Sequence, residues 1–140
     1  MARISPDDFN RLIVTDLPWA RDAGIVAEKT GAGEAVCRLP FAETSLRPGG
    51  TVSGPSMMML ADATMYAVVL SSIGEVTLAV TTNFNINFLR KPGHADLLAE
   101  GRAIKVGKRL AVVEVTVFSE SDHEPVAHAT GTYSIPPERG

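Results

Sequence analysis

The sequence has 140 residues, of which 45% are hydrophobic and 21% are charged, and it contains one cysteine. A chain of this length buries roughly two thirds of the surface that its unfolded form exposes, so residues 1–140 are predicted to form a single domain with one core. The net charge of −3 and the scattered basic residues argue against nucleic acid as a partner, and the lone Cys37 excludes an intrachain disulfide.

Residues 1–24 are predicted to form a short helical segment. Ser5 supplies a capping hydroxyl, and Pro6 suits the first helical position. Phe9 and Leu12 then follow at helical spacing. We therefore expect a short helix here, which is interrupted at Leu17-Pro18-Trp19.

A hairpin, a loop and a long apolar helix are predicted next. Residues 25–29 and 34–39 flank a Gly-rich turn, which indicates a β-hairpin. The Pro- and Gly-rich residues 40–53 have the composition of a loop. Residues 53–72 are apolar on nearly every helical face, so the rest of the chain should wrap this helix. Its longest apolar run is shorter than the roughly 20 residues of a bilayer span, which argues against a membrane protein.

Four strands are predicted in the second half of the chain. In the first, alternation places Phe84 on one face and Thr81 on the other, which is typical of a half-buried strand. The four predicted strands are residues 78–88, 95–106, 110–119 and 126–135. Together these elements predict an α+β domain in which a mainly antiparallel sheet packs against one central helix.

Asp62 is the most informative residue of the predicted central helix. Its neighbours at three and four positions are Met58, Met59, Met65 and Tyr66. A carboxylate in such surroundings is costly unless it is hydrogen-bonded or paired, and a carboxyl held there is suited to proton transfer. The alternative is structural: Asp62 caps a neighbouring backbone group or pairs with a distant Arg or Lys.

The start of the same helix is a second candidate site. Ser53 can cap the helix, and Pro55 can occupy its first turn. The free N–H of Gly54 could then polarise a carbonyl oxygen, although a plain helix cap would look the same in the sequence. Gly54 and Asp62 lie roughly 12 Å apart along one helix, so they could share a site only if two copies of the helix ran antiparallel in a dimer.

The remaining polar side chains give weaker signals. The three histidines lack metal-ligand spacing, and Cys37 has no activating neighbour, so neither a metal site nor a nucleophilic thiol is predicted. Basic residues near predicted strand ends could hold phosphate groups or could simply be solvated. They are Arg90, Lys91, Lys105, Lys108 and Arg109.

Residues 47–55 (RPGGTVSGP) and the later Leu-Ala-Asp at residues 60–62 resemble the hotdog-fold acyl-CoA thioesterases of the PaaI-like (phenylacetate-degradation) group. The resemblance covers about residues 24–135 and implies a hotdog fold, a mainly antiparallel sheet wrapped around one long central helix. Gly50, Gly54 and Asp62 stand where this family has its loop glycine, the first glycine of a His-Gly-Gly triplet, and its acid.

Three positions depart from the family pattern. Ser53 replaces the histidine of the triplet, Pro55 replaces its second glycine, and Arg47 stands where an asparagine is often found. Loss of the imidazole and the amide implies reduced activity or a different substrate class. Thr81 stands where some members place a serine that holds the attacking water.

The resemblance implies hydrolysis of acyl-CoA to free acid and CoA. The Gly54 amide would polarise the thioester carbonyl, and Asp62 of the partner subunit would activate water or attack directly. CoA would be part of the substrate, and no separate cofactor is expected. The substrate-binding residues implied are Arg47, Met58, Met59, Tyr66, Arg90, Lys108 and Arg109.

Two other functions remain open at this stage. One is a non-catalytic protein that binds acyl-CoA or an aromatic ligand, which the replacements Ser53 and Pro55 permit. The other, an acyl-thioester hydratase or dehydratase, generally has a histidine where Ala67 stands. In each case we expect a cytoplasmic homodimer, or a homotetramer built from two dimers, with the sites at the subunit interface.

Overall fold

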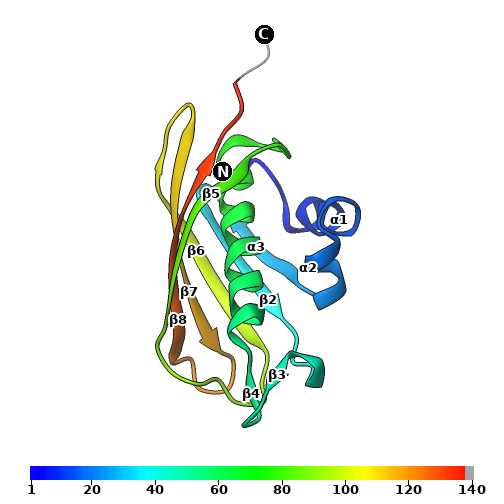
Figure 1. Ribbon diagram of the computed structural model, residues 1–140. Coiled ribbons are helices and arrows are strands. Elements are labelled where there is room, and N and C mark those ends of the chain that lie inside the picture. Colours follow the sequence, from blue (N-terminus) through cyan, green and yellow to red (C-terminus); the bar gives the residue numbers. More distant parts are fainter. Residues whose placement is uncertain (138–140) are drawn as a thin grey trace.

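In the computed structural model, which describes residues 1–137, one curved sheet wraps around one long helix (Figure 1). All neighbouring strands are antiparallel, and their order is β1-β2-β6-β7-β8-β5. The strands are β1 (Val26–Gly31), β2 (Glu34–Leu39), β5 (Val80–Phe88), β6 (Leu97–Val106), β7 (Leu110–Ser119) and β8 (Pro125–Ser134). The predicted α+β hotdog architecture is confirmed.

Capping residues mark both ends of the central helix α3 (Gly54–Ile73). Ser53 lies in extended conformation before it, and its side-chain oxygen accepts a hydrogen bond from the backbone N–H of Ser56. Pro55 occupies the first turn, where its missing N–H costs nothing. Gly74, with φ of 92°, ends the helix in a conformation that favours glycine.

One side of α3 packs directly against the sheet. A Cβ added at Gly101 of β6 would lie 2.8 Å from Cγ2 of Val68 on α3, so only glycine permits this close approach. Val115 of β7 lies against the same region and is fully buried. By length and composition α3 could cross a membrane, but 72% of its most apolar window is buried inside the protein, as in a core helix.

The N-terminal helices cover part of the other side of α3. They are α1 (Pro6–Asp16) and α2 (Pro18–Ala23), and the side chain of Ser5 caps α1. Phe9 is fully buried and meets the ring of Tyr66 on α3 edge-on, with the ring centroids 6.1 Å apart. In Figure 1 both helices stand beside α3, on the side away from β5.

A small hairpin lies at the N-terminal end of α3. It comprises a 3₁₀ turn, η1 (Glu43–Ser45), and two short strands, β3 (Leu46–Arg47) and β4 (Thr51–Val52). The N–H of Ser53 donates to the carbonyl of Ser45 at 2.8 Å, and this bond fixes the position from which α3 starts.

Strand β5 differs from its prediction in two ways. It forms an edge of the sheet and is largely exposed, with only Phe84 and Ile86 partly buried. A β-bulge between Thr81 and Asn83 inserts one extra residue, so Thr81 and Phe84 both face the same cavity beside α3. The predicted placement of Thr81 and Phe84 on opposite faces is therefore wrong, because simple alternation cannot show a bulge.

Candidate active site

Asp62 is held by hydroxyl groups from β5 and β8, at the edge of the sheet that lies beside α3. The phenol of Tyr133 donates to Oδ1 of Asp62 at 2.8 Å, and the hydroxyl of Thr81 donates to the same oxygen at 3.1 Å. Within residues 1–137, no Lys or Arg forms an ion pair with Asp62. The alternative that Asp62 pairs with a distant basic residue is therefore wrong.

Strand β8 brings Tyr133 to this carboxylate because it runs close to α3. A Cβ added at Gly131 would lie 2.5 Å from Sδ of Met65, so the backbone of β8 passes close to α3 two residues before the tyrosine. Tyr133 is only 3% exposed. Burial, and next the charge of Asp62, raises the pKa of the Tyr133 phenol well above its usual range, so this hydroxyl is a donor at neutral pH.

Asp62 opens into two neighbouring cavities, of about 380 Å³ and about 260 Å³. Trp19 of α2 and Thr81 line both. The larger cavity is otherwise lined by Met58, Met59 and Phe84, and the smaller includes Leu17, Tyr66, Thr77 and Tyr133. Of the predicted substrate-binding residues, Met58, Met59 and Tyr66 thus lie beside Asp62. The setting is one carboxylate among apolar and aromatic side chains.

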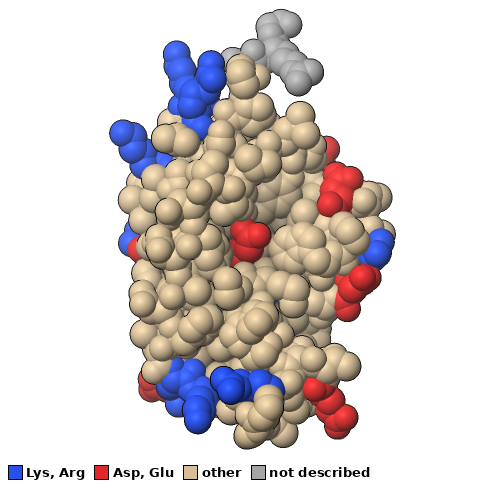
Figure 2. Space-filling view, in the orientation of Figure 1, with Lys and Arg blue, Asp and Glu red and all other residues tan. Residues whose placement is uncertain are grey.

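The face of the molecule shown in Figure 2 is largely uncharged in the middle and carries basic side chains at its two ends. Figure 2 shows one acidic side chain in the middle of a largely uncharged surface, with Lys and Arg side chains gathered at the two ends of the molecule. A ligand with an apolar part and an anionic part would match such a surface.

The N-terminus of α3 is a separate part of the same chain. The Ser53 hydroxyl hydrogen-bonds both the N–H and the hydroxyl of Ser56, so Ser53 acts here as a helix cap. The ring of Phe88 covers Gly54: a Cβ added there would lie 3.3 Å from Cζ of that ring. Among residues 1–137, no hydrogen bond from the Gly54 N–H is found. Because Gly54 and Asp62 are roughly 12 Å apart along α3, one chain does not bring them together.

The basic residues predicted to contact CoA lie at opposite ends of α3. Arg90 follows β5 at the N-terminal end, where it forms an ion pair with Asp122, and the exposed Arg47 lies in β3 at the same end. Lys108 and Arg109 instead line a cavity of about 740 Å³ at the C-terminal end of the helix. A single chain therefore does not gather these four side chains around one ligand.

Two residues beside Asp62 were not predicted from the sequence. Tyr133 is the one large side chain in an inward-facing row that otherwise holds Ala127, Ala129 and Gly131, and this pattern marks it as unusual. Trp19 follows a helix-breaking proline and gives no such signal. In neither case does the sequence show that the side chain lies next to Asp62.

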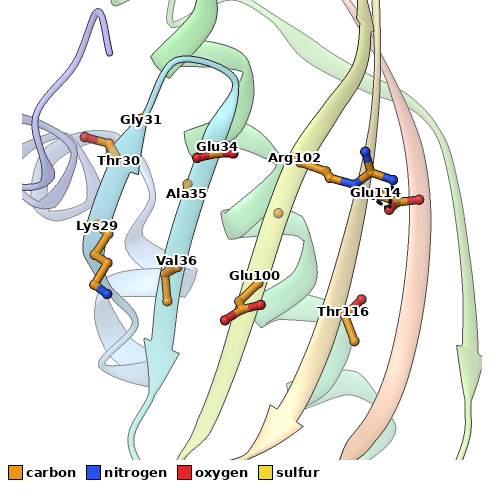
Figure 3. Close-up of a pocket in the computed structure, with 11 residues that line it drawn as sticks. Lys29, Thr30, Gly31, Glu34, Ala35, Val36, Glu100, Arg102, Glu114 and Thr116 are labelled. Atoms are coloured by element: carbon orange, nitrogen blue, oxygen red, sulfur yellow. Dashed lines mark hydrogen bonds and ion pairs between the residues drawn. The ribbon is translucent and has the colours of Figure 1, made fainter. Parts of the chain in front are cut away.

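A further cavity, of about 460 Å³, lies on the outer face of the sheet (Figure 3). Val36, Glu100 and Thr116 form a row across β2, β6 and β7, and their side chains point away from α3. An ion pair between Arg102 and Glu114 crosses the same face. This cavity is therefore separated from Asp62 by the full thickness of the sheet.

The described residues give no support for metal or thiol chemistry. No group of three His, Cys, Asp or Glu side chains lies close enough to hold a metal ion within residues 1–137. Cys37 is fully buried under the sheet side of α3, and burial raises the pKa of its thiol to about 12. A thiol in that state is not a nucleophile at neutral pH.

Comparisons with known proteins identify the family and agree with the fold. The sequence pattern of the Thioesterase superfamily matches residues 49–126, more than half of the chain. The chain is 31% identical to the "Putative esterase" of Halobacterium salinarum, over 96% of each chain. Among solved structures, a "putative thioesterase" from Silicibacter sp. is 42% identical, with a TM-score of 0.87 and coverage of 98% of this chain and 95% of the other. The phenylacetic acid degradation protein PaaI of Thermus thermophilus is 26% identical, with a TM-score of 0.76 and coverage of 85% and 99%.

Proposed function

The chain belongs to the Thioesterase superfamily, and we propose that it cleaves acyl-CoA thioesters into the free acid and CoA. The observation that carries this proposal is the position of Asp62: a carboxylate without a basic partner among residues 1–137, held by two hydroxyls at the junction of two apolar cavities. Such a group can accept a proton or attack an acyl carbon.

The reaction needs one carboxylate and one polarising donor. In the first route, Asp62 takes a proton from water as the water oxygen bonds to the acyl carbon. The carbon–sulfur bond then breaks, and the proton passes to the departing CoA thiolate. In the second route, Asp62 itself bonds to the acyl carbon and expels the thiolate, and water then hydrolyses the resulting anhydride. In both routes the N–H of a Gly54 stabilises the charge on the carbonyl oxygen.

A dimer formed through β5 would complete this site. The strand is an edge with unpaired backbone groups, and Val80 and Phe88 on it are 55% and 50% exposed. Met58, on the side of α3 that lies away from the centre of the sheet (the open side), is 41% exposed. If a second copy pairs antiparallel with β5 across a two-fold axis, its α3 runs antiparallel to the first, and Gly54 of the partner subunit approaches Asp62.

The same two-fold arrangement accounts for the separated basic residues. The C-terminal end of one α3, with Lys108 and Arg109, would lie beside the N-terminal end of the other, with Arg90. The phosphates of CoA would bind there, and the acyl group would enter the apolar cavity that contains Trp19 and Phe84. The phosphates of the substrate would thus contact basic side chains, and its acyl group would contact apolar side chains.

The test is release of free thiol from a panel of short, medium, long and aromatic acyl-CoAs, with wild type and Asp62→Asn side by side. The substitution keeps the size of the side chain and removes its basicity, so we expect kcat to fall by about 10²- to 10⁴-fold. Asp22→Asn, at an exposed surface pair with Arg21, should leave turnover unchanged.

Two results would contradict the proposal. Turnover that persists in Asp62→Asn would remove Asp62 from the mechanism. Saturable binding of acyl-CoA without thiol release from any ester would instead favour a binding protein, and the replacements at Ser53 and Pro55 would then be the natural explanation.

A further inference from the structure

We propose that Tyr133 is a positioning residue that, together with Thr81, holds Oδ1 of Asp62 and so leaves Oδ2 as the oxygen that reacts. This inference rests on the proposed function, because it assigns a role to a neighbour of Asp62 in that reaction. It goes beyond the proposed function in naming a residue of β8 and in distinguishing the two carboxylate oxygens.

The hydrogen bonds around the carboxylate are asymmetric. Oδ1 accepts from Tyr133 at 2.8 Å and from Thr81 at 3.1 Å, and the Tyr133 phenol also lies 3.2 Å from the backbone carbonyl oxygen of Asp62. Within residues 1–137, no hydrogen bond to Oδ2 is found, and the cavities lined by Asp62 provide room for a water or an acyl carbon beside the carboxylate. One oxygen is thus occupied and the other is available.

The phenol itself is held firmly in place. The Tyr133 ring stacks on the Tyr66 ring, with centroids 6.1 Å apart and planes inclined by 18°. Tyr66 is fixed in turn, since its hydroxyl donates to the carbonyl of Thr77 at 2.9 Å and its ring meets Phe9 edge-on. A carboxylate rotates readily about its last side-chain torsion, so a rigid donor on one oxygen fixes the plane of both.

Neutral donors also suit a carboxylate that must act as a base or nucleophile. An Arg or Lys in this position would neutralise Asp62, whereas Tyr133 and Thr81 stabilise the ionised carboxylate and leave its negative charge in the site. Since burial raises the pKa of the Tyr133 phenol, this residue keeps its proton and continues to donate.

The experiment compares Tyr133→Phe with wild type, using the best acyl-CoA from the panel. This change removes one hydroxyl and keeps the ring stack. We expect kcat to fall by about 10- to 100-fold with KM changed by less than about twofold, because the reacting oxygen is misplaced while the binding surface is intact.

Two further variants separate this role from a structural one. Thr81→Val removes the second donor from an exposed strand and should lower kcat by a smaller factor, again with little change in KM. Thr64→Val removes a buried hydroxyl from α3 that donates only to the carbonyl of Leu60, and should change neither kcat nor KM.

The outcomes are distinct. If Asp62→Asn is inactive while Tyr133→Phe matches wild type in kcat, the role of Tyr133 is wrong and the proposed function stands. If Asp62→Asn keeps the turnover of wild type, the role of Asp62 in the proposed function fails, and this inference fails with it. If Tyr133→Phe does not fold, the test passes to Thr81→Val, and an unchanged kcat in that variant overturns the inference.

Discussion

The two sides of α3 differ in how tightly their side chains are packed. On the sheet side the contacts are close: a Cβ added at Gly101 would lie 2.8 Å from Val68 and 3.0 Å from Thr64, and Val68 and Val115 are fully buried. On the open side, a carboxylate faces two cavities, and Met58 is 41% exposed. Twenty consecutive residues of one helix thus serve a packed core on one side and a candidate active site on the other.

This difference separates stability from function along a single element. The sheet side buries large apolar area, at about 25 cal/mol per Å² removed from water, and this burial holds the helix in place. The open side leaves apolar surface unburied and holds a charged group by only two hydroxyls. We therefore expect changes on the sheet side to affect mainly folding, and changes on the open side to affect mainly assembly and turnover.

Of the changes that compare the two sides of α3, the largest effect is expected at the exposed edge of the sheet. Val80→Lys places a charge on the exposed β5 edge and should convert the proposed dimer into single chains, with thiol release reduced about tenfold or more. Ile104→Lys, at an equally exposed position of β6, is the matched control and should remain dimeric. Light scattering gives the mass, and a dimer that survives Val80→Lys would place the subunit interface elsewhere.

The sheet side should respond through stability. Gly101→Ala introduces a Cβ at 2.8 Å from Val68 and 3.0 Å from Thr64, so we expect a loss of about 1–3 kcal/mol in the free energy of unfolding. Gly93→Ala, with nothing within 4 Å of the added Cβ, should be near neutral. Urea unfolding at fixed protein concentration measures both. Equal stability of the two variants would mean that α3 is less tightly packed on β6 than the contacts indicate.

A second carboxylate provides a structural counterpart to Asp62. Asp96 accepts the N–H of Phe41 at 2.7 Å and the guanidinium of Arg38 at 2.8 Å, and these bonds, the backbone one first, hold its pKa below the usual range. The resulting stabilisation is complete above the pKa of the unfolded carboxyl, about 3.9, and is lost as the pH falls through the lowered folded value.

Asp96→Asn should therefore destabilise the protein by about 1 kcal/mol at pH 7 and by progressively less below about pH 4, without a change in kcat. Urea unfolding across this pH range provides the measurement. A difference between variant and wild type that stays constant with pH would mean that the charge of Asp96 contributes nothing, and that only the shape of its side chain matters.

The smallest effect concerns Cys37, which lies under the sheet side. Because burial raises the pKa of its thiol to about 12, we expect no labelling by Ellman's reagent at pH 8 in the folded protein and complete labelling in urea. The folded enzyme would then add no background to the thiol-release assay. Rapid labelling without urea would show that the sheet side opens readily.

Much of the fold follows from patterns that act over a few residues. Alternating side chains, Gly and Pro turns and a capped apolar helix predicted the strands and α3, because these signals arise from local backbone geometry. The prediction failed at β5, where a bulge moves Thr81 to the face of Phe84 and where the strand lies at an edge. Whether a strand is central or at an edge depends on pairing with distant residues, which no local pattern records.

The candidate site was likewise predicted from the sequence only in part. The sequence alone identified Asp62, since a lone acid among apolar neighbours at helical spacing is unusual wherever the helix lies. It also identified Ser53 and Gly54, because helix starts have a local signature. Only the tertiary structure brought Tyr133, from 71 residues further along the chain, to 2.8 Å from that acid, and placed Trp19 over the same cavity. Hydrogen bonds and cavities of this kind depend on how the sheet curves around α3, and that curvature is a property of the whole packed chain.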